Sequence, residues 1–223
     1  MNLITIEKLF TVIMETLGMT FISTLLAYIV GLPLGTLLYV TSKNGICKNK
    51  IINSIFGFIV NILRSIPCLL LIVILMPLTR LIFTRGTGRW FTIIVPLFFA
   101  SFPFVSRMVE QSLQEVDYGV IEAAKSLGAT PIKIIKKVLF SEARSSLISG
   151  IGVSAVSILG YTAFASEISA GGLIATAYAQ YESNTSNPWH INIWIIILLV
   201  IALVQAIQEI GQLLSRKLDK RRK

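Results

Sequence analysis

Hydrophobic residues make up 54% of this 223-residue chain and charged residues only 14%, and the mean hydropathy is +0.78. A soluble globular domain carries about 25% charged residues, so the composition indicates a membrane protein. The formal net charge is +9. Because the basic residues gather in particular loops, as described below, this charge is explained without nucleic-acid binding.

The uncharged runs of the sequence predict an all-α membrane protein with five transmembrane helices. A span needs about 20 mostly apolar residues. Two shorter runs are separated only by Arg64, and we combine them into one span. The expected helices are residues 19–41, 53–78, 90–106, 146–166 and 191–213. We expect residues 1–17 to form an outer N-terminal segment, residues 18–213 the transmembrane domain and residues 214–223 a basic cytoplasmic tail. Residues 1–18 have no basic region or cleavage site typical of a signal peptide.

The second and third spans contain an arginine and four prolines. Arg64 would cost about 2.5–3.5 kcal/mol in hydrocarbon, so it should face protein, water or headgroups. It is either a structural pin or gate element near the cytoplasmic half, or a side chain that snorkels to the inner interface. Pro67 and Pro77 should bend the second span, as Pro96 and Pro103 should bend the third. The alternative is that prolines are simply common in membrane helices.

Residues 117–141 form a polar loop between the third and fourth spans. Asp117 is suited to cap a short helix, and Gly128 is the residue type that ends helices in the left-handed conformation. Thr130 is then expected to cap a second helix that starts at Pro131, where the missing N–H costs nothing. Two short amphipathic helices around a glycine corner are suited to entering a groove on a partner. The alternative is a helix pair lying on the bilayer surface.

The fourth span is expected to carry a common face of small residues, which allows close helix approach. They either pack against a second copy of the chain or line a pore, and they are Gly150, Gly152, Ser154, Ala155, Ser157 and Gly160. Beyond this span lies an expected outer loop from Ser169 to His190. Its Tyr178 and Tyr181 belong to an interfacial aromatic belt or dock a binding protein.

The basic residues predict how the chain is oriented. Only Lys8, Arg80, Arg85 and Arg89 fall on one side of the predicted spans. The other side holds fifteen, which the positive-inside rule places in the cytoplasm. These are Lys43, Lys48, Lys50, Arg107, Lys125, Lys133, Lys136, Lys137, Arg144, Arg216, Lys217, Lys220, Arg221, Arg222 and Lys223. We therefore expect the N-terminus outside, and the C-terminus and the 117–141 loop inside.

Nothing in the sequence predicts catalysis, a metal site or a cofactor. Cys47 and Cys68 fall in different environments and are expected to be free thiols. His190 is the only histidine, and no phosphate-binding or hydrolase motif is present. No acidic residue lies deep within a predicted span to bind a coupling ion, and no convincing internal repeat suggests a secondary transporter. Energy for any transport should therefore come from elsewhere.

Residues 18–215 resemble the methionine-uptake permeases of bacterial ABC importers. Four stretches carry the resemblance: residues 64–67 with 77–80, residues 103–110, residues 122–141, and residues 160–161 with 169–173. The third stretch is similar to the coupling loop of the family, since it opens Glu-Ala-Ala at Glu122 and has Gly128 six residues later. The Leu-Pro that ends the loop in the family is replaced here by Phe140 and Ser141.

The resemblance implies a type I ABC importer permease fold and a homodimer in the bacterial plasma membrane. Two cytoplasmic ATPase subunits would hydrolyse ATP, so that this chain is not an enzyme, and an extracytoplasmic lipoprotein would deliver L- or D-methionine. Membrane lipid would surround the dimer. The implied coupling residues are Glu122, Ala123, Ala124, Leu127, Gly128, Ile132 and Val138. The implied pathway or gate residues are Arg64, Pro67, Ser157, Tyr161 and Phe164, with Phe164 closing the pore.

Two other interpretations stay open at this point. The chain could be an importer permease for another amino acid or a small peptide, because pore linings in this superfamily discriminate weakly. It could also be a membrane scaffold or channel whose cytoplasmic loop simply docks a partner. A channel would conduct without ATP.

Overall fold

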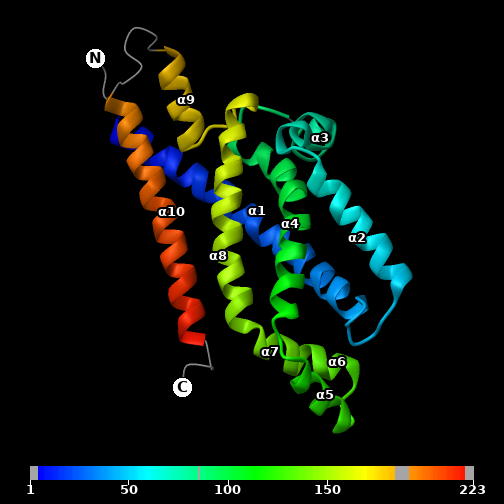
Figure 1. The fold of residues 1–223 in the computed structure, drawn as a ribbon. Helices are drawn as coiled ribbons and strands as arrows, with labels where there is room; N and C mark the ends of the chain where they lie inside the picture. Colours follow the sequence, from blue (N-terminus) through cyan, green and yellow to red (C-terminus); the bar gives the residue numbers. More distant parts are fainter. Residues whose placement is uncertain (1–4, 85, 184–190, 219–223) are drawn as a thin grey trace.

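The computed structural model describes residues 5–84, 86–183 and 191–218, and the regular elements in these ranges are helices (Figure 1). Four of them are long and apolar enough to cross a membrane. They are α1 (Ile6–Thr41), η1 with α4 (Trp90–Ile93 and Ile94–Gln114), α8 with η3 (Arg144–Tyr161 and Thr162–Ile168), and α10 (Ile191–Leu218). These helices confirm four of the predicted spans, with different ends.

Helix α1 crosses the centre of the molecule diagonally and packs mainly against α4 (Figure 1). The hydroxyls of its buried Thr16, Thr20 and Thr24 donate to carbonyls one turn back, as Thr20 does to Thr16 at 2.8 Å. These buried hydroxyls are therefore hydrogen-bonded. Further along the same side of α1, glycines admit α4. A Cβ on Gly31 would lie 2.6 Å from Cγ1 of Val105, and one on Gly35 would overlap the carbonyl oxygen of Ser106.

The expected outer segment 1–17 is largely part of the first helix, because α1 begins at Ile6. Residues 1–4 lie outside the described residues. At the other end of the chain α10 runs on to Leu218, so residues 214–218 of the expected tail are helical and residues 219–223 lie outside the described residues. Both boundaries were placed by charge. A helix can continue past a charged residue as long as its backbone hydrogen bonds are kept. This explains why both helices extend beyond the predicted boundaries.

The expected second span, 53–78, is wrong as a continuous helix. Helices α2 (Lys50–Ser65) and α3 (Cys68–Phe83) meet at 104°. Pro67 has no N–H to continue α2, and it pushes the preceding Ile66 into an extended conformation with φ −83° and ψ 120°. Pro77 lies inside α3, which continues past it. The pair counts as a fifth span only if the bent helices are taken together.

Proline has weaker effects in the third span, and the fourth changes its helix type. Pro103 lies inside α4, and Pro96 occupies its first turn, where an N–H is not needed. Helix α4 continues to Gln114, beyond the expected end at Ser106. The fourth span tightens into a 3₁₀-helix from Thr162 onward.

The expected outer loop 169–190 contains a helix, α9 (Leu173–Ser183), while residues 184–190 lie outside the described residues. The start of α9 is fixed by α1. The N–H of Gly172 donates to Oε2 of Glu15 at 2.8 Å, and the N–H of Leu173 donates to Oγ1 of Thr16 at 2.8 Å. Gly171 and Gly172 have φ of 86° and 89°, which explains why two glycines stand here.

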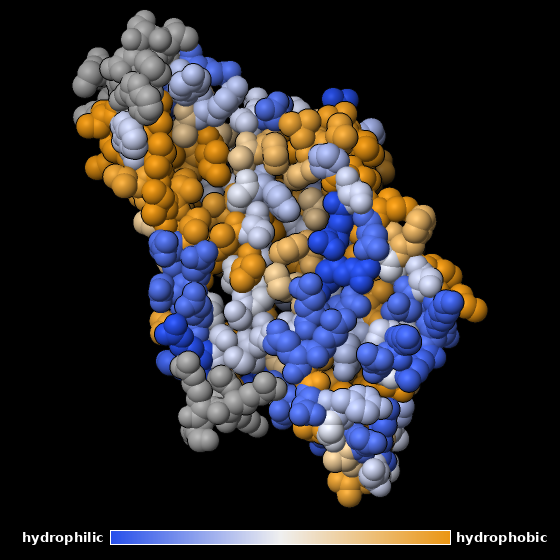
Figure 2. All heavy atoms as spheres, in the orientation of Figure 1, coloured by the Kyte–Doolittle hydropathy of each residue, from blue (hydrophilic) through white to orange (hydrophobic). Residues whose placement is uncertain are grey.

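Four buried clusters hold the described helices together, and the two smaller ones pack α10 against α1, α8 and α9. Of the two larger ones, one lies around Met19, Ile93, Leu97 and Ala165, where α1, the start of the third span and η3 meet. The other joins α4 to the segment after it and includes Val109, Leu113, Ile121, Ile134 and Leu139. Outside these clusters the long helices expose apolar side chains, and Figure 2 shows these over the upper part of α10 and around α3. Such a surface fits a lipid environment.

Candidate coupling surface and pathway

The segment that follows α4 folds into short helices that project from one end of the molecule (Figure 1). They are α5 (Tyr118–Ser126), α6 (Pro131–Ile134), a π-helical turn η2 (Ile135–Leu139) and α7 (Phe140–Glu142), after which α8 begins. The two-helix reading of residues 117–141 is confirmed, and the second helix widens into a π-turn. The lysines at positions 136 and 137 lie on this turn.

Local chemistry sets the corner between the short helices as the sequence predicts. Oδ1 of Asp117 accepts from the N–H of Gly119 at 2.7 Å, which caps α5. Gly128 has φ 75°, and its N–H donates to the carbonyl of Lys125 at 2.9 Å. A left-handed residue that closes the last carbonyls of a helix is a typical C-terminal cap. Pro131 is the first residue of α6, as expected, but Thr130 before it makes no side-chain hydrogen bond to the helix, so the predicted cap by its hydroxyl is wrong.

The short helices bury one face and expose the other. Ile121 and Ile134 are 1% exposed, and they pack in the same cluster as α4. On the other face Leu127 is 88% exposed and Ile132 is 67% exposed. Large apolar side chains left bare outside the spans mark an interaction site. We call the exposed residues Val120, Glu122, Ala123, Leu127, Gly128 and Ile132 the coupling surface.

Two of the expected coupling residues lie differently. Ala124 is partly buried, and Val138 packs against the cluster that includes Leu139 and Val109. Val138 is therefore placed beneath the coupling surface rather than on it. The π-turn explains this position, because its i→i+5 hydrogen bonds add a residue to the turn and shift a side chain away from the face that an α-helix would give it.

A polar link connects α4 to α2. Arg107 forms an ion pair with Glu110, with Nη1 and Oε2 2.6 Å apart. Nη2 of Arg107 donates to Oδ1 of Asn61 at 2.8 Å and to the carbonyl of Gly57 at 3.4 Å. Glu110 is 7% exposed, so its charge depends on this partner. Sequence reasoning missed the pair because the third span was ended at Ser106. The Arg-x-x-Glu spacing was the available signal.

The expected pathway residues fall in separate places. Arg64 lies in the last turn of α2, about 21 Å along the helix from Lys50, and Pro67 lies at the corner with α3. Arg64 thus lies at the end of α2 that meets α3, away from the connection between α1 and α2. Tyr161 and Phe164 are half-buried against the Met19 cluster.

The small residues of α8 do not share one face. A Cβ on Gly152 would lie 3.3 Å from Cα of Gly211 in α10, and one on Gly150 would lie 3.1 Å from Cγ of Met108 in α4. The hydroxyl of Ser154 is 3.3 Å from that of Tyr28. These three positions serve contacts within the chain, which corrects the expectation of a common face. Ser157 is partly exposed and Gly160 is exposed.

Cys47 and Cys68 are free thiols, as expected. Within the ranges that the structure describes, no group of three His, Cys, Asp or Glu side chains could hold a metal ion.

The fold is that of a multi-pass membrane protein with an exposed helical surface at one end for a partner. The comparison with known families then identifies it: the chain belongs to the family of binding-protein-dependent transport system inner membrane components, whose model matches residues 31–220. The family is thus that of the permeases of ABC transporters, as the resemblance implied.

Curated relatives and a solved structure agree with this assignment. A Vibrio cholerae protein described as a probable D-methionine transport system permease, MetI, is 38% identical over 96% of this chain and 94% of its own length. The methionine import system permease MetP of Bacillus subtilis is 43% identical over 83% of this chain and 82% of its own. A chain of the inward-facing MetNI methionine ABC transporter superposes with TM-score 0.91 at 36% identity, covering 99% of this chain and 100% of that one.

Proposed function

We propose that this chain is the permease subunit of an ATP-driven importer that carries methionine, as the L or the D form, across the bacterial plasma membrane. Two copies would form the pathway, two cytoplasmic ATPase subunits would supply the energy, and an extracytoplasmic lipoprotein would deliver the substrate. The methionine systems to which the relatives belong support the substrate. The observation that carries the coupling role is the coupling surface, with Leu127 88% exposed beside the glycine corner.

The ATPase subunits would bind the coupling surface. The carboxylate of Glu122 in α5 would accept a hydrogen bond from the partner, while Leu127 and Ile132 would fill apolar depressions of the partner. ATP binding draws the two ATPase subunits together and with them the two coupling surfaces. ATP is hydrolysed in the ATPase subunits, and this chain converts their movement into the alternating opening of the pathway.

Movement of the short helices would reach the spans by two contacts. Ile121 and Ile134 are buried with Val109 and Leu113 of α4, so α4 follows α5 and α6 as one body. Arg107 then joins α4 to Asn61 of α2. The result is that α2 and α4 change their positions together, which opens the pathway alternately to each side.

The side of the membrane follows from the same arrangement. The short helices and their lysines would be cytoplasmic, and the start of α1 with α9 would face outward. Fifteen basic residues on the inner side against four on the outer support this orientation.

The pathway between the two copies would be lined by partly or fully exposed residues of α8, including Ser157, and by the corner of α2 and α3 with Arg64 and Pro67. Tyr161 and Phe164, in the half with the Met19 cluster, would close it on the outer side. The apolar members of this set, Pro67, Tyr161 and Phe164, suit the thioether side chain of methionine.

The test is uptake of radiolabelled L-methionine into proteoliposomes that contain this chain, its ATPase and its binding protein. We expect uptake that requires internal ATP and that excess unlabelled L-methionine blocks; D-methionine as a competitor tests the second form. ATP-dependent uptake of a different amino acid would keep the permease role and replace the substrate. Uptake that is indifferent to ATP would contradict the importer and favour a channel.

A further inference from the structure

The connection between α1 and α2, residues 42–49, is held tightly against the end of α1. The N–H of Cys47 donates to the carbonyl of Val40 at 3.0 Å, and that of Asn49 donates to the carbonyl of Thr41 at 3.1 Å. A side chain at Gly45 would overlap the backbone of Val40. The lysines of this connection are therefore carried by a fixed backbone.

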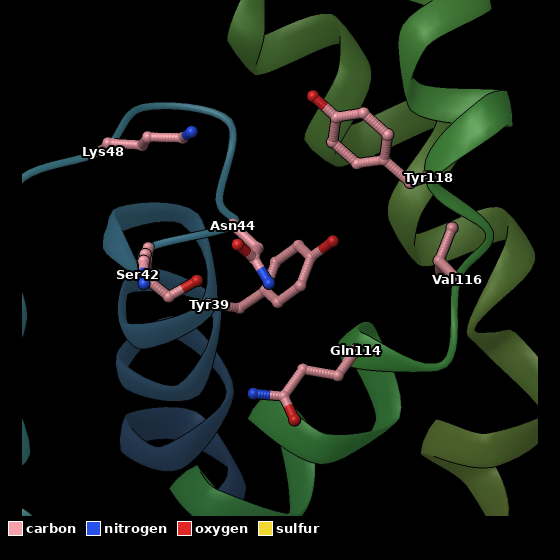
Figure 3. A pocket seen from close by; sticks show the side chains of 8 residues that line it. Tyr39, Ser42, Asn44, Lys48, Gln114, Val116 and Tyr118 are labelled. Atoms are coloured by element: carbon pink, nitrogen blue, oxygen red, sulfur yellow. The ribbon is translucent and has the colours of Figure 1, made fainter.

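Two cavities open on the connection and share Ser42, Lys43 and Lys48. One has a volume of about 570 Å³ and is also lined by Asn49, Lys50 and Asn53. The other, of about 640 Å³, lies toward the start of α5. Figure 3 shows its Tyr39 and Asn44 between the connection and Tyr118.

The smaller cavity is lined by cationic and neutral polar groups. Its lining includes Lys43, Lys48 and Lys50 and contains no carboxylate. Three ammonium groups on one cavity repel each other unless an anion lies between them. The first turn of α2 adds no acidic residue, and the single ion pair of the described residues, Arg107 with Glu110, lies elsewhere. The cavity therefore suits an anionic ligand, and three lysines suit a phosphate group.

The surface beside the cavity indicates where the phosphate comes from. Helix α2 starts at Lys50, and along one of its faces Ile51 is 73% exposed, Ile55 53% and Phe58 65%. These positions follow one another at helical spacing and lead from the lysines into the membrane-facing part of α2. A phosphate with acyl chains attached would cover both the lysines and this apolar face, whereas a soluble phosphate would cover the lysines alone.

We propose that the cavity formed by Lys43, Lys48 and Lys50 binds the phosphate of an anionic phospholipid, whose acyl chains lie along Ile51, Ile55 and Phe58 of α2. Lys43 and Lys48 also line the cavity next to Tyr118, the first residue of α5. The bound headgroup thus holds the connection that neighbours the coupling surface.

The test measures lipid retention by the purified full-length chain in detergent, using native mass spectrometry. The probes are phosphatidylglycerol, phosphatidylcholine with the same acyl chains, and glycerol 3-phosphate as the soluble phosphate. The test variant is K43Q/K48Q. The matched control is R216Q/K217Q, which removes the same charge from exposed positions at the end of α10. A K43R/K48R variant keeps the charge and checks that the connection still folds.

We expect saturable binding of phosphatidylglycerol by the natural sequence, a loss of about 30-fold in K43Q/K48Q, and less than a twofold change in R216Q/K217Q and K43R/K48R. Phosphatidylcholine should bind far more weakly. Equal losses of phosphatidylglycerol binding in both glutamine variants would overturn the site, because they would show that the lipid is held by general electrostatic attraction to the basic surface. Binding of glycerol 3-phosphate as tight as that of phosphatidylglycerol would assign the cavity to a soluble phosphate and overturn the lipid.

Discussion

Glu15 and Gly172 are joined by a hydrogen bond of 2.8 Å between a carboxylate oxygen of α1 and the backbone N–H before α9. The carboxylate lies at the positive end of α9, where a negative charge is favourable. Because Glu15 lies in the first part of α1, this contact links the start of the first span to the segment after the fourth span. The two glycines at 171 and 172 allow this hydrogen bond to form.

Glu15→Ala should destabilise the folded chain by about 1–2 kcal/mol, because it removes the cap from α9. Gly171→Ala should have an effect of similar size, since its φ is 86° and its Cβ would lie 2.5 Å from Oε2 of Glu15. Thermal unfolding in detergent measures both. Thr11→Ala is the control, because this exposed hydroxyl bonds only within α1. A control as unstable as Glu15→Ala would show that the effect belongs to α1 in general.

Leu127→Ser and Ile132→Ser should each weaken binding of the ATPase subunit about tenfold or more without lowering the thermal stability of the isolated chain. The reason is that burying a leucine-sized side chain contributes about 1.5–3 kcal/mol, and here the burial would occur only in the complex. Titration of the solubilised chain with the ATPase subunit measures the affinity. Leu81→Ser is the matched control, since Leu81 is 82% exposed on α3. A normal affinity of both test variants would remove these side chains from the interface.

Gly128→Pro and Glu122→Lys should abolish transport while the chain still inserts into the membrane. Proline cannot adopt the φ of 75° found at Gly128, so the corner between α5 and α6 must change. Lysine at position 122 reverses a charge on the coupling surface. ATP-dependent uptake and the amount of membrane-inserted chain are measured side by side.

Comparing two glycines separates a coupling role of Gly128 from the stability cost of placing a side chain at a positive φ. Gly88→Ala and Gly128→Ala both put alanine at a positive φ, and a Cβ at either position meets nothing within 4 Å. Their costs in stability should match, at about 1–2 kcal/mol. Only Gly128→Ala should reduce uptake. Equal uptake by the two variants would contradict a coupling role for the corner.

Arg107→Ala should destabilise the chain more than Asn61→Ala. The first variant leaves the Glu110 carboxylate buried without its partner, at a cost of up to about 3 kcal/mol, whereas the second removes one hydrogen bond to a charged group, worth about 1.5 kcal/mol. Unfolding in detergent gives the order. The double variant Arg107→Ala with Glu110→Gln should recover part of the loss, and no recovery would show that the arginine stabilises by packing alone.

Local chemistry explains which parts could be predicted. The cap at Asp117, the left-handed Gly128 and the first position of Pro131 depend only on neighbours in the chain, and all three are confirmed. The break at Pro67 was expected as a bend, but its 104° was not. Proline removes one hydrogen bond wherever it stands, and the surrounding helices determine whether the chain continues past it, as at Pro77 and Pro103.

The sequence by itself determined that this protein is an all-helical membrane protein, because hydrophobic length and charge spacing act along the chain. It also determined the glycine corner of the coupling surface. Only the tertiary structure decided that Glu15 caps α9, that Arg107 of α4 reaches Asn61 of α2, and that Gly152 meets Gly211. These contacts connect positions far apart in the chain. Their partners are selected by how helices pack in three dimensions, and no local pattern encodes that selection.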